Sequence, residues 1–318
     1  MPRSKSGKGH TLIGLYDARG AGDAIMMLGV ASIIKKNYPH IQIRLENRGG
    51  FSTLYRHHPD LSPSIKPTAW LRNINYRMGL DWRSGLNFHQ SVAKLYVEPW
   101  LDLELKDLDV HPKVFLKKHE SKHPYGGKPY SIWYSGSKND VTVKHLYPPT
   151  VSKIVKGLRD RGYQGDCLQF GATWDNHPRI DGTIDKRGVL PPRVLANWFL
   201  HADFVVCGAS MPLFLAEAVG TRCFCLAGGR EVTSYLKMPN NQIYDIRDLD
   251  CSAEPCDRYV TVPIGTHWLD SRPCLRPVKT EAGTYPACTL RYNPEELASD
   301  IHNYLTGRIA LPCLQKYS

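Results

Sequence analysis

Blocks of apolar and polar residues alternate along the first fifty positions of the chain. A short apolar run at 11–17 ends in an acid and predicts a buried strand, followed by a glycine-rich turn. Residues 24–38 are apolar around most of a helical circumference, with two lysines in the last turn and Pro39 as a stop, which predicts a helix. Alternation at 41–46 predicts a second strand. This βαβ order places the turn at the carboxyl end of the first strand, where α/β sheets bind ligands.

The alternation resumes after a less regular middle part. Between residues 49 and 100 the only clear period predicts a helix near 89–97, and a strand is predicted at 112–118. The polar, Pro- and Gly-rich stretch 119–129 predicts a connection between two domains. Beyond it, strands are predicted at 130–136, 167–172, 203–208 and 223–229, and helices at 149–161, 194–202 and 211–220.

Two βα blocks on either side of a polar connection predict an α/β protein with two facing Rossmann-like domains. A chain of 318 residues is long enough for two cores. We divide it into an N-terminal domain (1–122), a linker (123–129), a second Rossmann-like domain (130–250), a cysteine-rich finger (251–290) and a C-terminal helix and tail (291–318).

Four cysteines cluster in a segment where Pro, Gly and Thr break every helical period: Cys251, Cys256, Cys274 and Cys288. Four thiolates around a metal ion would replace the missing core, because metal binding energy becomes folding energy in loop-rich elements. Only the first pair is compact, which departs from a standard zinc ribbon. The pattern favours a structural metal, and disulfides or unrelated buried thiols are the alternatives.

Global composition indicates an ordinary water-soluble protein with a basic surface. Nine cysteines, an odd number, favour reduced thiols. No apolar run reaches the roughly 18 residues that span a bilayer, and charged residues interrupt the apolar stretch after the basic N-terminus. We therefore expect a cytoplasmic protein without a transmembrane segment.

The net charge of +11 attracts anions such as nucleotide phosphates, phosphorylated glycans, acidic membranes or nucleic acid. A basic surface without a polyanionic partner is the alternative. The positive charges form no long block, which weakens the case for a nucleic-acid-binding arm.

The first candidate site is the turn Arg19, Gly20, Ala21, Gly22 and Asp23. Glycines let the backbone approach a ligand closely, and a helix N-terminus favours an anion. The turn is not the G-x-G-x-x-G dinucleotide fingerprint. The pattern alone favours Asp23 as the helix N-cap over a general base at the mouth of a cleft.

The second candidate site is the turn Gly208, Ala209 and Ser210 between a strand and a helix that Ser210 would cap. Backbone amides of such a turn point toward a phosphate. An ordinary strand–helix connection is an equal alternative.

Two basic residues could complete this second site. Lys144, in a loop ahead of a helix, could reach a diphosphate as a point charge, and Arg230 in the loop Gly228, Gly229 and Arg230 could clamp a phosphate. The alternative for each is a solvated surface side chain.

In their order, these segments resemble the bacterial heptosyltransferases of glycosyltransferase family 9. The resemblance covers most of the chain except about residues 50–85. It rests on AGDAIMMLGVASIIKKNYPHIQIRL, HQSVAKLYVEPWLDLELKDLDVHPKVFLKKHE, VKHLYPPTVSKIVKGL and ADFVVCGASMPLFLAEAVGTRCFCLAGG. It implies the GT-B fold, two Rossmann-like domains with the active site between them.

The resemblance also implies an activity. The N-terminal domain would bind the acceptor and the second domain the donor, a nucleoside diphosphate heptose, ADP-linked. The sugar would pass with inversion to a hydroxyl group on a protein or glycan, without a catalytic metal. Asp23 would be the catalytic base, Lys144 would contact the diphosphate, and the turn from Gly208 to Ser210 would bind donor phosphate or ribose.

One departure from the family concerns the donor helix. The family carries D-[ST]-G and then a histidine, whereas this chain has Ala209-Ser210-Met211 and places Phe214 at the histidine position. The missing acid and imidazole put the identity of the donor in doubt.

Residues 228–301 resemble the autotransporter heptosyltransferase branch, which carries an iron-binding four-cysteine finger and assembles into rings. The resemblance implies structural iron or zinc on the four cysteines, and a homo-oligomer; four thiolates suit either metal.

Two other classes of function stay open. The charge of +11 favours a glycosyltransferase that acts on nucleic acid. The departures at the donor helix favour a non-catalytic module that binds a sugar nucleotide or a glycan.

Overall fold

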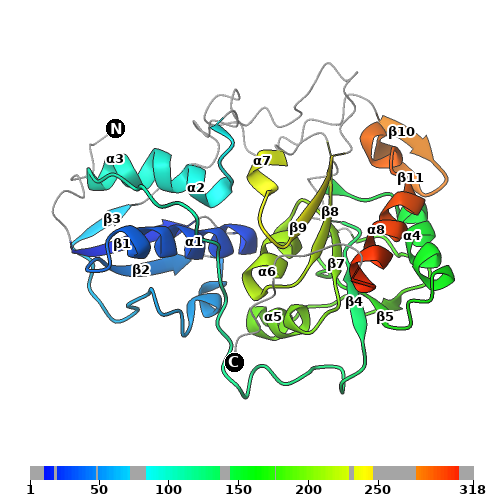
Figure 1. Cartoon of the computed structure of the whole chain (residues 1–318), viewed down its shortest axis with the longest axis horizontal. Helices are drawn as coiled ribbons and strands as arrows, with labels where there is room; N and C mark the ends of the chain where they lie inside the picture. Colours follow the sequence, from blue (N-terminus) through cyan, green and yellow to red (C-terminus); the bar gives the residue numbers. More distant parts are fainter. Residues whose placement is uncertain are drawn as a thin grey trace.

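A computed structural model describes residues 11–17, 20–47, 49–71, 84–136, 144–175, 177–228, 233–245 and 277–307. Two parallel sheets lie side by side, a three-stranded sheet built from the first part of the chain and a six-stranded sheet built from the second (Figure 1). The α/β architecture with two parallel sheets confirms the fold class predicted from the alternating pattern. Among the described helices, none combines the length and apolarity that crossing a membrane requires.

The first sheet has β1 (Leu12–Asp17) at its centre, between β2 (Gln42–Asn47) and β3 (Ala69–Leu71). All three strands are parallel. Helix α1 (Ala21–Asn37) connects β1 to β2, which confirms the predicted βαβ unit. A 3₁₀ turn, η1 (Ser52–Tyr55), follows β2 and packs against α1.

A second helical layer covers α1. It consists of α2 (Phe88–Val92), a π-helical turn η3 (Ala93–Val97) and α3 (Glu98–Leu101), and it confirms the helix predicted near 89–97. Helices α1 and α2 approach closely, because a methyl group added at Gly29 would lie 2.9 Å from the His89 ring.

The strand predicted at 112–118 is wrong. This segment forms no strand, and the amide of Val114 donates instead to the carbonyl oxygen of Ala218 at 2.9 Å. Pro112 and Val114 are buried and the residues between and after them are less so. Burial therefore alternates at 112–114 as in a strand, but the segment hydrogen-bonds to a helix and not to a sheet.

The second sheet has the strand order β6-β5-β4-β7-β8-β9, all parallel. The order reverses between β4 and β7, the type of position where doubly wound sheets bind ligands. The strands are β4 (Tyr130–Trp133), β5 (Asp166–Gln169), β6 (Ile184–Asp185), β7 (Val205–Gly208), β8 (Cys223–Ala227) and β9 (Asn241–Asp245).

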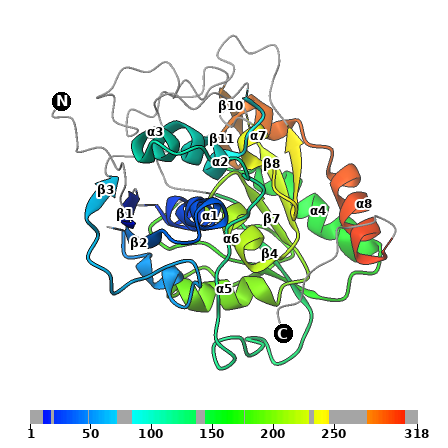
Figure 2. The ribbon, with the colours of Figure 1, turned by 60° about the vertical axis from the view of Figure 1, so that its left-hand side comes forward.

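Helices cover both faces of this sheet (Figure 2). Helices α4 (Pro148–Asp160) and α8 (Pro294–Leu305) pack together on one face, around a core that includes Trp133, Phe204 and Phe224. Helices α5 (Pro192–Leu200) and α6 (Met211–Val219) cover the other face. A short α7 (Thr233–Leu236) precedes β9.

The core on the α5 and α6 side continues into the first sheet. Every residue of α1 from Ala24 to Ile34 is buried, because its own sheet, α2 and α6 surround it. One apolar cluster joins Ile13 and Leu15 of β1 to Leu213 and Ala216 of α6.

The C-terminal part adds a hairpin of β10 (Pro277–Thr280) and β11 (Gly283–Pro286), a 3₁₀ turn η6 (Ala287–Leu290), and α8. The predicted C-terminal helix is therefore present. Its first turn is tied to α4, where Arg161 donates to Glu295 at 2.8 Å.

The buried His89, which packs against α1, should make the protein less stable in mild acid. His89 is fully buried, and its Nε2 lies 2.6 Å from the carbonyl oxygen of Val110. Burial lowers the pKa of His89 to about 4, and this histidine is neutral in the fold. An unfolded histidine titrates near 6.5, so the stabilisation is complete above that pH and is lost as the pH falls toward 4.

We expect the free energy of unfolding to fall by about 1 kcal/mol per pH unit between pH 6 and pH 5 from this group. His89→Gln can still donate to Val110 but does not titrate, so it should show a smaller loss. Urea unfolding at pH 7, 6 and 5 measures the difference, and equal slopes for the two proteins would contradict it.

Candidate functional site

Two helix N-termini meet at the edges where the strands of both sheets end. Helix α1 begins after β1 and α6 begins after β7, and the helices lie side by side in Figures 1 and 2. A methyl group added at Gly22 would lie 3.2 Å from Cδ2 of Phe214 and 3.7 Å from Cα of Met211. The positive ends of two helix dipoles are therefore directed to one region, which favours an anionic ligand there.

Asp23 lies in the first turn of α1, at its third helical position. Its carboxylate accepts a hydrogen bond from the amide of Gly20 at 3.2 Å. The assignment of Asp23 as N-cap is wrong, because Gly20 is extended (φ −83°, ψ 151°) and holds the N-cap position. The helix starts earlier than predicted, and the half-buried carboxylate reaches back over the helix N-terminus.

The turn after β7 is covered by the loop that contains Lys144. A methyl group added at Gly208 would lie 2.6 Å from the backbone oxygen of Lys144. The amide of Leu146 also donates to the carbonyl oxygen of Ser135, just after β4, at 2.8 Å. The structure thus brings the backbone of Lys144 against Gly208, at the switch point between β4 and β7.

Ser210 occupies the N-cap of α6, as predicted, and its side chain makes no capping hydrogen bond to this helix. Pro212 has no amide hydrogen, and the amide of Leu213 donates to the carbonyl oxygen of Ser210 at 3.1 Å. An anion at this turn would therefore meet the amides of residues 209–211 rather than those deeper in the helix.

The other predicted site residues fall in three groups. Gly228 is buried directly after β8, the strand that pairs with β7. Arg19, Gly229 and Arg230 lie outside the described residues, as do Cys251, Cys256 and Cys274. Cys288 is buried in η6, and within the described ranges no group of His, Cys, Asp or Glu is arranged to hold a metal.

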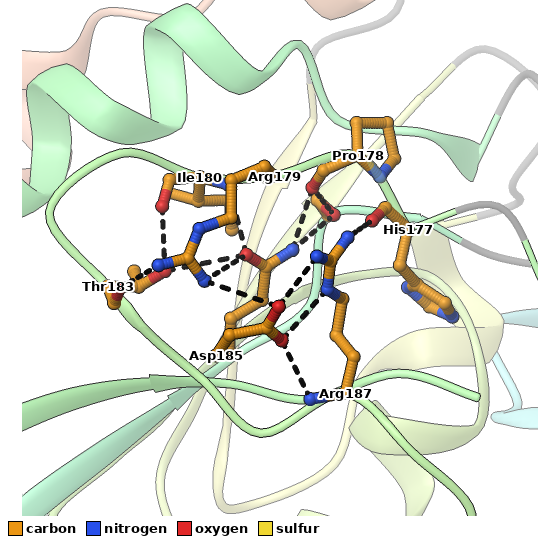
Figure 3. Close-up of polar contacts among 9 residues, drawn as sticks. His177, Pro178, Arg179, Ile180, Thr183, Asp185 and Arg187 are labelled. Atoms are coloured by element: carbon orange, nitrogen blue, oxygen red, sulfur yellow. Dashed lines mark hydrogen bonds and ion pairs between the residues drawn. The ribbon is translucent and has the colours of Figure 1, made fainter. Parts of the chain in front are cut away.

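A polar network at the ends of β4 and β5 escaped prediction (Figure 3). Gln169 is fully buried, and its amide nitrogen donates to the carbonyl oxygen of Pro178 at 2.7 Å and to Ser135 Oγ at 3.1 Å. Its side-chain oxygen accepts from the amide of Ile180 at 3.0 Å. These bonds fix the loop 177–183 to the sheet. The only sequence signal was a glutamine at the end of an apolar strand.

Charged groups extend this network outward (Figure 3). Arg187 donates to both carboxylate oxygens of Asp185, at 2.9 and 2.7 Å, and also to the carbonyl oxygen of His177 at 2.7 Å. These bonds hold the pKa of Asp185 far below its usual range. The loop beside it presents Trp174, which is 63% exposed, followed by Asp175. An exposed indole thus lies in the loop that follows β5, three residues before His177, which accepts from Arg187.

The sequence matches no family model and no curated protein. Its fold matches the iron-containing dodecameric glycosyltransferase TibC from enterotoxigenic E. coli H10407, with a TM-score of 0.65, 17% identity, and coverage of 95% of this chain and 81% of TibC. It also matches E. coli ADP-heptose LPS heptosyltransferase II, with a TM-score of 0.61, 12% identity, and coverage of 93% and 99%. The chain shares the fold of these two proteins.

A further match is TibC in complex with ADP-D-β-D-heptose, with a TM-score of 0.65, 18% identity, and coverage of 94% of this chain and 78% of TibC. The heptosyltransferase fold confirms the architecture that the resemblance implied. At these identities it fixes the architecture and leaves each residue's role to the local geometry.

Proposed function

We propose that this chain is a glycosyltransferase that moves a heptose from an ADP-linked donor to a hydroxyl group. The observation that carries the proposal is the meeting of α1 and α6 at their N-termini. This meeting supports a site with Asp23 on one side and the turn Gly208–Ser210 and the Lys144 loop on the other. The shared fold with TibC, which was solved with ADP-D-β-D-heptose, supports an ADP-sugar as donor.

In the proposed reaction, the carboxylate of Asp23 takes the proton of the acceptor hydroxyl as its oxygen attacks the anomeric carbon. The new carbon–oxygen bond forms as the bond from the anomeric carbon to the diphosphate breaks, with inversion. Backbone amides of residues 209–211 and the Lys144 ammonium would stabilise the negative charge of the departing diphosphate. Arg230 remains a predicted clamp on the same group.

The nucleoside end of the donor is proposed to lie over β5. In doubly wound sheets that bind dinucleotides, an acidic residue after the second strand binds the ribose, and we extend that placement to β5. Here β4 and β5 are the first and second strands, and Asp175 follows β5 beside the exposed Trp174. Asp175 would accept from a ribose hydroxyl, and the indole would stack on the base.

Trp174→Ala is expected to weaken ADP binding about tenfold, since stacking of a base on an aromatic ring contributes about 1–3 kcal/mol. Trp174→Phe should retain most of the affinity. Isothermal titration with ADP measures both, and Val278→Ala, another exposed apolar residue, is the control. If Trp174→Ala binds ADP as tightly as the wild type, the base does not stack on Trp174.

A thermal-shift screen against ADP-, UDP-, GDP- and CDP-sugars tests the proposed donor. A ligand that binds only the folded state raises its stability with the logarithm of ligand concentration over Kd. A shift selective for ADP-heptose, followed by release of ADP when an acceptor is added, supports the function. A selective shift with another nucleotide sugar would identify that compound as the donor in place of ADP-heptose. The absence of a shift with every nucleotide sugar would argue against glycosyl transfer.

We also propose that the four cysteines Cys251, Cys256, Cys274 and Cys288 hold a structural iron or zinc ion. A thiolate set of four suits both metals. Cys288 lies buried between the β10–β11 hairpin and α8, where a bound ion would fasten the preceding segment. Metal content per chain should be about one in the wild type and should fall in Cys288→Ser. A homo-oligomer, as in dodecameric TibC, is part of the same proposal.

A non-catalytic sugar-nucleotide module is the second candidate, and Phe214 is the observation that favours it. Phe214 packs against Gly22, so this position of α6 supplies an apolar contact in place of a polar one. The screen separates the candidates, because a pure binding module would show a donor shift but no release of ADP with any acceptor.

A further inference from the structure

Two polar side chains of helix α5 and a third just after it, spaced four residues apart, hydrogen-bond to one segment of the chain. Asn197 donates from Nδ2 to the carbonyl oxygen of Lys122 at 2.8 Å. Nε2 of His201, just after the helix, lies 2.8 Å from the carbonyl oxygen of Ser121. Arg193 donates to Glu120. The segment 115–122, which leads from the first sheet to the second, is thus bound along one face of α5.

Arg193 makes the most extensive of these contacts. It is only 7% exposed, and its guanidinium donates to both oxygens of Glu120, with Nε 2.6 Å from Oε1. It also donates to the carbonyl oxygen of Phe115 at 2.8 Å. Glu120 is held in turn, because Oε2 accepts from the amide of Lys117 at 2.9 Å. The hydrogen bonds from Arg193 lower the pKa of Glu120 to about 2.

The same guanidinium reaches the first sheet's side of the molecule. One terminal nitrogen donates to the carbonyl oxygens of Thr53 and Arg56, at 3.2 and 3.3 Å. Thr53 lies in η1, which packs against α1. A single side chain from α5 therefore joins three segments, and its partners lie from 73 to 140 residues away in sequence.

The two halves of the molecule also meet along α1 and α6. Those contacts are apolar, as between Gly22 and Phe214, and apolar contacts impose little direction. A planar guanidinium with paired donors fixes orientation as well as distance. The Arg193 contacts therefore restrain rotation of the first sheet about the apolar contact between α1 and α6. Asp23 lies at the N-terminal end of that contact.

We propose that Arg193 is a positioning residue that sets the first sheet, and with it Asp23, against the donor turn Gly208–Ser210. Only the kinetic consequence rests on the proposed function. A displacement of about 1 Å between reacting groups can lower a rate by about a hundredfold. Loss of the Arg193 contacts should therefore slow transfer without weakening donor binding, since the proposed donor site lies on the second sheet alone.

Arg193→Lys tests whether the joint contact of Arg193 with Glu120 and η1 matters. Lysine keeps the charge and can still reach Glu120, but it lacks the fork that contacts Glu120 and η1 together. Small-angle scattering of the purified protein should show a larger radius of gyration in Arg193→Lys than in the wild type. Arg161→Lys is the matched control, because its ion pair with Glu295 joins α4 to α8 on one face of a single sheet. Equal scattering from all three proteins would overturn the proposal.

The kinetic arm uses ADP binding and ADP release. Arg193→Lys should bind ADP within about twofold of the wild type. Its rate of sugar transfer, measured as ADP formed, should be about 10–100-fold lower. A loss of ADP affinity equal to the loss in rate would indicate a general structural role instead. If the wild type itself binds no ADP, the proposed donor fails, and the scattering comparison still decides the role of Arg193.

A second variant covers the case in which Arg193→Lys does not fold. Glu120→Gln removes the partner charge and one acceptor but leaves the carbonyls of Thr53, Arg56 and Phe115 in place. It should change scattering and rate in the same direction by a smaller amount. Wild-type values for both would overturn the proposal.

Discussion

Asp23→Asn is expected to lower the rate of sugar transfer by at least about a hundredfold, since general-base help contributes about 10²–10⁴-fold. Asparagine keeps an oxygen that accepts from the amide of Gly20, so the start of α1 should stay intact. The amide cannot take the acceptor proton. ADP affinity should stay within about twofold, because the proposed donor contacts lie on the second sheet.

Asp107→Asn is the control for this variant. Asp107 pairs with Lys36 in the last turn of α1 at 2.9 Å, so the substitution removes a carboxylate at the far end of the same helix. It should leave transfer unchanged. Full transfer by Asp23→Asn would remove this carboxylate from the mechanism.

Gly208→Ala is expected to weaken ADP binding about tenfold or more and to lower the free energy of unfolding by about 1–3 kcal/mol. The added methyl group would lie 2.6 Å from the backbone oxygen of Lys144, which is closer than carbon and oxygen can approach. The clash is with a backbone atom, so no side-chain rotation relieves it. The loop and the phosphate turn must therefore separate.

Gly188→Ala provides the comparison, because a methyl group at Gly188 meets nothing within 4 Å. It should retain wild-type stability in urea and wild-type affinity for ADP. If Gly208→Ala behaves like Gly188→Ala in both measurements, the close contact at the switch point does not govern donor binding.

Elements whose signals are local could be predicted from the sequence. The unit β1–α1–β2 carries apolar runs, a glycine turn and Pro39 within forty residues. The end of α6 was equally clear, since Gly220 takes the left-handed conformation (φ 81°) that glycine tolerates best. Such signals depend on neighbouring residues alone, and the two parallel sheets followed from their order.

Two local predictions were wrong, the first through the immediate neighbours and the second through a distant part of the fold. Asp23 has the chemistry of an N-cap, but the extended Gly20 starts α1 three residues earlier. The alternation at 112–118 is typical of a strand, yet the amide of Val114 donates to Ala218 of α6 and not to a neighbouring strand. Propensity and period report which side of a segment is buried, and tertiary packing decides what covers it.

The part of the site that escaped prediction depends on distant partners. Arg193 resembles any arginine in a first helical turn until η1, 140 residues earlier in the chain, is folded beside it. Gln169 acquires its role from a loop that follows it and from Ser135 before it. The approach of the Lys144 backbone to Gly208 is likewise invisible in the local sequence, and the resemblance to the heptosyltransferases implied only that both would contact the donor.

The buried length of α1 has a consequence for synthesis of the protein. Its residues from Ala24 to Ile34 leave the ribosome long before the helix that completes their cover. At about 5–20 residues per second, translation reaches α6 roughly 10–35 s after α1. During that interval the nascent chain carries an apolar helix without its final neighbour, a natural substrate for a chaperone. The first half of the protein therefore cannot complete its core until the second half has been synthesised.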